Sequence, residues 1–146
     1  MDKPRPHVTA ALLCESVLQE SNGTLSVVRI ADKVGYDPTG MPEGFRPAFK
    51  ISGLISLKAG PVVGDHNLKV VVENPQGKRT QIYELALKLM GRDQGQNLIV
   101  TLNLGIEHDG LHWFDVIFDD DEVLTRIPLM VMQEAAAAPT SKVPTP

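Results

Sequence analysis

The chain has 146 residues, of which 42% are apolar and 22% are charged, with a formal net charge of −4 and a sequence pI near 5.5. This size predicts a single domain, and the composition is that of a soluble globular chain that folds without help from metals or disulfides. The basic residues are scattered, which argues against nucleic-acid binding and anionic-membrane binding, because both need a basic patch.

The N-terminal residues predict neither a signal peptide nor a membrane span. Two prolines interrupt Met1 to His7, and the apolar run that starts at Val8 ends near Cys14. No stretch reaches the roughly 20 apolar residues that a spanning helix needs. We therefore expect a cytoplasmic, bacterial-type protein. The single Cys14 has apolar neighbours, so it is predicted to be a buried structural thiol and not a nucleophile.

Alternation of apolar and polar residues predicts about eight β-strands, separated by turns rich in Gly, Asn, Asp and Pro. The expected strands span residues 8–19, 24–34, 48–57, 67–74, 79–90, 97–106, 112–118 and 123–132. One apolar and one polar face per strand is typical of stacked antiparallel sheets. The sequence predicts an all-β fold, a two-layer antiparallel β-sandwich over residues 8–133. An N-terminal arm, 1–7, precedes it, and a flexible Ala/Pro-rich tail, 134–146, follows.

The segment 35–47, "GYDPTGMPEGFRP", is long for a connection within a small domain. Six of its residues are Gly or Pro, and it displays Tyr36, Phe45 and Arg46. Long ordered loops often carry binding residues, so these three are predicted to bind a partner. The alternative is a strand crossover whose aromatic side chains cap the end of the sandwich.

The segment 79–90 is the most ambiguous predicted strand. Its apolar residues fit one face of a helix, but Tyr83, Leu85, Leu87 and Leu89 also alternate as in a strand. The pattern favours a strand, and a helix stays open as the alternative. The following "GRDQGQ", residues 91–96, is predicted to be a turn.

The stretch "HDG", His108 to Gly110, predicts a three-residue hairpin loop between the segments 97–106 and 112–118. This loop length pairs Leu104 with Phe114 on the core face and places Trp113 outside, opposite Gly105. Trp113 then either covers the bare glycine backbone or anchors a binding surface. In such a hairpin His112 lies opposite Ile106 and His108 lies in the loop, so no metal site is expected from "HDGLH".

Four consecutive acids, Asp119, Asp120, Asp121 and Glu122, stand between two apolar alternating runs. The apolar parity changes from Phe118 to Val123, which predicts a hairpin tip with an even-length loop, made of all four acids or of the central two. Contiguous acids point in different directions, whereas calcium needs six to eight converging oxygens. The four are therefore only weak metal candidates, and no metal or other cofactor is expected.

No catalytic signature occurs in the sequence. It has no phosphate-binding glycine loop, no G-x-S-x-G, no C-x-x-C and no H-E-x-x-H. The sequence therefore favours a protein that is not an enzyme.

Four stretches together suggest a family. "AALLCESV", "NGTLSVVRIADKV", "NPQGK" and "DDEVLTRIPLMV" resemble an uncharacterised bacterial family of single β-sandwich domains, known only as a domain of unknown function. The resemblance covers about residues 8–132. It implies the sandwich fold, and it carries no catalytic or binding residues, because the shared motifs are structural.

The leading functional hypothesis is a non-catalytic module that binds another protein or has a structural role, as an accessory component of a larger assembly. The expected partner is a protein, self-association is left open, and neither nucleic acid nor membrane is expected. The alternative is a small-ligand or carbohydrate-binding module that uses the 35–47 loop with Trp113. A hydrolase assembled from loops is the remote third hypothesis.

Overall fold

The computed structural model describes residues 4–134, with Asp93 described by its backbone only. It contains seven strands: β1 (His7–Gln19), β2 (Leu25–Ile30), β3 (Lys33–Tyr36), β4 (Ala48–Glu73), β5 (Arg79–Gly105), β6 (Gly110–Phe118) and β7 (Glu122–Gln133). No helix in this range is long and apolar enough to span a membrane. The strands run from His7 to Gln133. Of the predicted tail, 134–146, only Glu134 is among the described residues.

The two longest strands, β4 with 26 residues and β5 with 27, form one continuous antiparallel hairpin. Each contains two of the predicted strands, and the segment 79–90 is strand, as the pattern favoured. The predicted turn at 91–96 is wrong, because the chain continues through it as part of β5. The register shifts between Lys58 and Val63 of β4, opposite Gly91 and Arg92, which both have positive φ. The glycines here form a bulge inside the hairpin.

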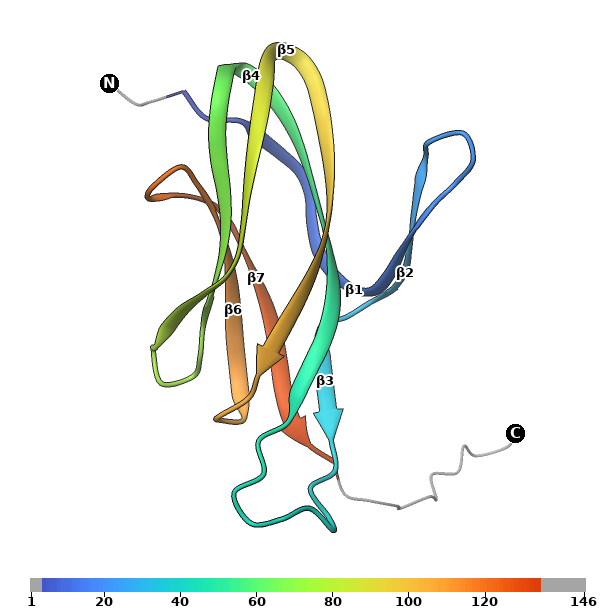
Figure 1. Cartoon of the computed structure of the whole chain (residues 1–146), viewed down its shortest axis with the longest axis vertical. Coiled ribbons are helices and arrows are strands. Elements are labelled where there is room, and N and C mark those ends of the chain that lie inside the picture. Colours follow the sequence, from blue (N-terminus) through green and yellow to red (C-terminus); the bar gives the residue numbers. More distant parts are fainter. Residues whose placement is uncertain (1–3, 135–146) are drawn as a thin grey trace, which may run out of the picture.

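The long hairpin contributes to both layers of the sandwich (Figure 1). The first half of β4 pairs with β1, which also pairs with β2, whereas the second half of β4 pairs with β6. β6 then pairs with β7, and β7 pairs with the short β3 in parallel, while every other pairing is antiparallel. The all-β, two-layer, mostly antiparallel sandwich is therefore confirmed.

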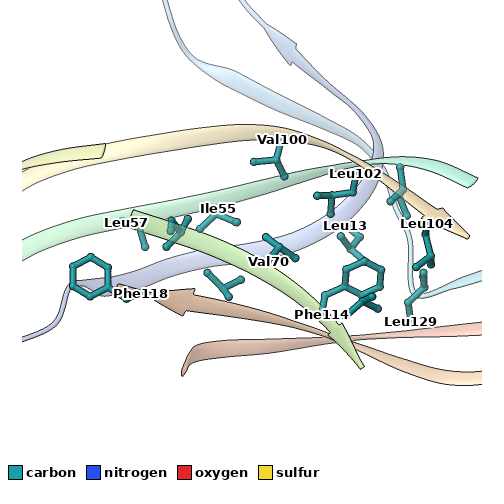
Figure 2. Packing of buried hydrophobic residues seen from close by; sticks show 14 of the residues in the cluster. Leu13, Ile55, Leu57, Val70, Val100, Leu102, Leu104, Phe114, Phe118 and Leu129 are labelled. Carbon is teal, nitrogen blue, oxygen red and sulfur yellow. The ribbon is translucent and has the colours of Figure 1, made fainter. Parts of the chain in front are cut away.

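The core lies between the layers, where the predicted apolar faces meet (Figure 2). Leu13, Val100 and Leu102 come from one layer, and Val70, Phe114 and Leu129 come from the other. Phe114 is completely buried. Burial of a side chain of this size contributes roughly 1.5–3 kcal/mol to folding.

The predicted hairpin between the segments 97–106 and 112–118 is wrong. β5 pairs only with β4, and Gly105 to Gly110 crosses from one layer to the other. Gly105 lies opposite Ala48, whereas Trp113 lies opposite Glu73 and Pro128. His112 lies opposite Leu129 and not Ile106. The alternation of apolar residues identified the core-facing side of each strand correctly. However, two strands that pair in one sheet and two strands that face each other across the core show the same alternation, so it does not tell which strands pair.

The acidic segment is the tip of the β6–β7 hairpin, as predicted, but the predicted even-length loop is wrong. Phe118 pairs with Glu122, so the loop has the three residues Asp119 to Asp121. A bulge next to the tip adds one residue to β7, because Ile117 pairs with Val123 and Val116 with Thr125. Beyond the bulge, the apolar residues of β7 face the core as the alternation predicted. Leu124 is the extra residue and packs on the core, while Val123 is exposed.

Candidate binding face

The outer surface of the second layer centres on β6, which lies between β4 and β7. Its even-numbered residues Phe114 and Val116 point into the core, so Trp113 and Asp115 point outward. Trp113 is half-buried, whereas Asp115 is buried and shares this with only one other polar side chain, His112, among the described side chains. A buried carboxylate on an outward-facing position needs partners that cover it.

Two arginines cover Asp115, one from β7 beside β6 and one from β5 on the far side of β4. Arg126 Nε on β7 donates to Asp115 Oδ1 at 2.6 Å, and Arg79 Nη1 on β5 donates to Oδ2 at 2.8 Å. Glu73 on β4 accepts from Arg79 at 3.1 Å and from Arg126 at 3.4 Å. We call these four residues the Asp115 cluster. Its two positive and two negative charges cancel, so the cluster is an ordered, neutral network.

Asp115 remains ionised in this network. Its burial acts to raise the pKa of the carboxyl, but the hydrogen bonds and charges of Arg126 and Arg79 outweigh it and lower the pKa below the ordinary value. The same hydrogen bonds to Asp115 raise the pKa of both guanidinium groups.

Trp113 lies beside the Asp115 cluster. The guanidinium carbon of Arg126 is 4.7 Å from the centre of the indole ring, which is cation–π geometry. The indole ring therefore packs against Arg126, and the prediction that Trp113 lies opposite Gly105 is wrong. The same face of β6 and β7 also carries Leu111, 38% exposed, and Met132, 37% exposed. We call Leu111, Trp113, Arg126, Pro128, Met130 and Met132 the β6–β7 face.

The loop residues predicted to bind a partner are placed at one end of the sandwich. The Tyr36 hydroxyl donates to Asp109 Oδ1 at 2.6 Å, and this bond raises the pKa of the tyrosine. Arg46 forms an ion pair with Glu107 at 3.5 Å. Both contacts fasten the loop to the β5–β6 crossover. Phe45 is 42% exposed, so of the three predicted loop residues it presents the most apolar surface.

The structure therefore separates the four predicted binding residues into two groups. Tyr36 is the last residue of β3, and Phe45 and Arg46 lie in the loop that follows it at the end of the sandwich, so the predicted loop starts two residues later than expected. Trp113 belongs to the β6–β7 face. Sequence reasoning missed Arg79, Asp115 and Arg126. The available signal was a lone acid inside the apolar run "HWFDVIF", since such an acid needs a basic partner when it is buried.

The first and last acids of the hairpin tip have basic partners within the chain. Asp119 Oδ2 lies 2.9 Å from His66 Nδ1, and Asp119 Oδ1 accepts from the Asn67 backbone N–H at 3.1 Å. Glu122 accepts from Arg5 at 2.9 Å. Residues 4–134 contain no group of three or more His, Cys, Asp or Glu side chains placed to hold a metal ion.

His66 is held from both sides. Its Nε2 lies 3.0 Å from the Val63 carbonyl, and its ring stacks on Phe118 with 4.8 Å between centres. Both ring nitrogens face oxygen acceptors, which favours the doubly protonated imidazolium. The bond to Asp119, followed by the bond to Val63, raises the pKa of His66.

Cys14 is fully buried in the first layer, which confirms the prediction of a buried thiol. Burial raises the pKa of the thiol, so its reactive thiolate form is disfavoured.

Comparison with known proteins assigns a family. A model described as a family of unknown function, DUF6941, matches residues 9–132, so the chain belongs to that family. The resemblance to a domain family of unknown function is thereby confirmed. Among curated proteins, the comparison finds no match.

Solved structures share the fold at low sequence identity. An alkylpurine DNA glycosylase of Pseudomonas fluorescens, bound to DNA with an abasic site analog, is 10% identical with a TM-score of 0.51. The match covers 89% of this chain and 31% of the glycosylase. A β-glucosidase of Listeria innocua is 9% identical with a TM-score of 0.50, and the match covers 92% of this chain and 17% of that enzyme.

A third solved structure, the CARDB domain of a Pyrococcus furiosus protein, is 11% identical with a TM-score of 0.45. The match covers 92% of this chain and all of that domain. At these identities the likenesses concern the fold alone.

Proposed function

We propose that this member of the DUF6941 family is a non-catalytic module that binds another protein through the β6–β7 face. The observation that carries the proposal is Trp113 stacked with Arg126, on the same face as the exposed side chains of Leu111 and Met132. Tryptophan, arginine and methionine are enriched at protein interfaces, and tryptophan and arginine dominate their binding hot spots.

The Asp115 cluster prepares this face for binding. Asp115 holds Arg126 with a 2.6 Å hydrogen bond, and Arg126 in turn lies over the Trp113 ring. Side chains that are already ordered lose less conformational entropy when a partner binds. The methionines at positions 130 and 132 add flexible, polarisable surface that adapts to the shape of a partner.

The internal contacts of the loop favour this face over the loop as the binding site. A sugar-binding loop needs free polar groups beside an aromatic ring. The Tyr36 hydroxyl is bonded to Asp109, and the Arg46 guanidinium is paired with Glu107. Two of the three predicted loop residues therefore act within the fold. A protein partner fits an accessory role in a larger cytoplasmic assembly.

Site-specific photo-crosslinking in the source cells tests the proposal. A benzophenone amino acid at Met132 reports on the β6–β7 face. The matched control carries it at Leu18, an exposed apolar residue of β1, 52% accessible. We expect a discrete crosslinked product from position 132 that is absent from position 18.

A second substitution, in the protein that carries the probe at Met132, tests whether the crosslink depends on the β6–β7 face. Leu111→Asp places a charge on the same face at a residue that lies outside the core. The crosslink should disappear while the circular dichroism spectrum stays unchanged. Crosslinks that are identical at positions 18 and 132, or that survive Leu111→Asp, contradict the proposal.

A further inference from the structure

A cavity of about 210 Å³ lies at the end of the sandwich, bordered by the beginning and the end of β5. Val72 and His112 line it from the core side. The exposed residues Lys78, Thr80, Gly105 and Glu107 also line it. The cavity therefore combines a buried floor with a polar rim, which is the usual composition of a small-molecule site.

Gly105 borders the cavity with its backbone. A Cβ added at this residue would meet no atom within 4 Å, and its φ is outside the left-handed region that favours glycine. Neither the backbone nor a neighbouring side chain therefore requires glycine at this position of β5. A glycine within a strand often marks a place where another molecule approaches the backbone.

His112 presents a hydrogen-bond acceptor to the cavity. Its side chain is buried, and Nδ1 lies 3.0 Å from the Gly110 carbonyl, which can only accept, so Nδ1 carries the proton. In the neutral ring Nε2 is then an acceptor. No buried side-chain nitrogen or oxygen among residues 4–134 lacks a partner, and Nε2 has no partner within this range. The Nε2 atom is therefore accessible, and the space it faces is the cavity, because the His112 side chain lines it.

Lys78 gives the rim a positive charge. Within the described part of the chain its ammonium group forms no ion pair, whereas Glu107, the acid on the rim, is paired with Arg46. The Thr80 hydroxyl lies on the same rim. A carboxylate matches the lysine and the hydroxyl, and a hydroxyl on the ligand matches the acceptor of His112.

We propose that this cavity binds a small hydroxycarboxylic acid. The carboxylate of the ligand lies against Lys78 and Thr80, and its hydroxyl donates to His112 Nε2. The volume corresponds to about seven water molecules at roughly 30 Å³ each, which sets the size of the ligand at six or seven heavy atoms. The negative charge of Glu107 disfavours a second carboxylate. The site is distinct from the β6–β7 face and does not depend on protein binding.

Titration of the full chain with lactate, followed by two-dimensional amide NMR, tests the proposal. We expect shifts confined to residues around the cavity, with Gly105 and His112 among them. Propionate, which lacks the hydroxyl, should bind roughly tenfold more weakly, because one hydrogen bond is lost. Lys78→Gln should weaken lactate binding by a similar factor.

Thr80→Phe fills the cavity from its rim and should abolish the shifts while the spectrum stays dispersed, because Thr80 is exposed and lies opposite Val72 on the face that lines the cavity. Thr80→Val, which removes the hydroxyl, serves as the milder variant and should weaken binding. The proposal is overturned if lactate causes no localised shifts, or if Thr80→Phe and Thr80→Val both bind lactate as the wild type does. Equal binding of propionate and lactate overturns the role of His112.

Discussion

Two aspartates of the β6–β7 hairpin, four positions apart, have opposite environments. Asp115 stands alone in an apolar strand, and its side chain is 3% exposed between two arginines. Asp119 begins a run of four acids, and its side chain is 44% exposed beside His66. The four consecutive acids, which stand out in the sequence, lie at the solvated end of the hairpin. The single Asp115, which does not stand out, holds the arginines of the outer face in place.

The difference shows that burial, and not the local density of charge, decides how much an acid matters to the fold. A charge pair in water interacts weakly, and the same pair shielded from water interacts several times more strongly. Asp115 has little access to water and relies on guanidinium groups from β5 and β7. Asp119 keeps its access to water and needs His66 much less.

The largest effect is expected from Asp115→Asn. The change replaces the two charge-assisted hydrogen bonds of a buried carboxylate by those of an uncharged amide, and the loss costs about 3 kcal/mol. Urea denaturation should show this decrease in the free energy of unfolding. Asp119→Asn is the matched control in the same hairpin, with an expected loss below about 1 kcal/mol. Equal losses in the two variants would remove the distinction between the two sites.

The bulge beside the acidic tip gives the next largest expected effect. Leu124 packs on the core and Val123 is 41% exposed. Leu124→Ala should therefore lower the free energy of unfolding by about 2 kcal/mol. Val123→Ala should lower it by less than about 0.5 kcal/mol. The reverse order in urea denaturation would mean that the even-length loop, with Val123 turned inward, is the correct register.

Much of the fold follows from local patterns. Alternation at Leu98, Val100, Leu102 and Leu104 identified a strand and its core face, because side chains on a strand alternate whatever the strand pairs with. The hairpin tip at the four acids follows in the same way from Phe118 and the apolar run after it. The length of that loop does not, because a bulge shifts the parity by one residue without any sequence signal at that point.

The arrangement of strands in the layers was not predictable from alternation. Leu104 and Phe114 both face the core, which is compatible with neighbours in one sheet and with partners in opposite sheets. The continuity of β4 through Gly60 and of β5 through Gly91 decides between these options. Glycines at both positions resemble turn signals, and the tertiary structure uses them for a bulge.

The candidate sites depend on those long-range pairings. Arg79 and Asp115 are 36 residues apart in sequence, and they meet only because β4 aligns with both β5 and β6. The cavity at Gly105 likewise exists because the two ends of β5 border the same space. Trp113 is identified from its position in the alternation alone. This predicts correctly that its side chain points outward, but it does not predict which residues lie beside it.

Stability should depend on pH with opposite signs at Asp115 and at His66, the partner of Asp119. The pKa of Asp115 is lowered in the fold, so its contribution is present above the unfolded value of about 3.9 and is lost as the pH falls through the folded pKa. The pKa of His66 is raised, chiefly by Asp119. Its contribution is complete below about 6.5 and is lost as the pH rises through the folded pKa.

Urea denaturation across these two ranges separates the contributions. Asp115→Asn should flatten the acid side of the stability profile relative to the wild type. Asp119→Asn should flatten the side above about pH 6.5, by less than about 1 kcal/mol, because solvent screens this partly exposed pair. A slope above pH 6.5 that is unchanged in Asp119→Asn would show that His66 does not depend on its neighbour.

The smallest effect is expected at the tip itself. Asp120 and Asp121 are exposed in the loop, so Asp120→Asn should leave the urea midpoint unchanged within error in 0.5 M salt, where surface charges are screened. At low salt the variant should be equal to the wild type or slightly more stable, because one repulsion between like charges is removed. Calorimetry with calcium should show no heat of binding. A micromolar binding event that is lost in Asp120→Asn would reverse the comparison, because the conspicuous acids would then form a site and the stability of the tip would depend on the metal.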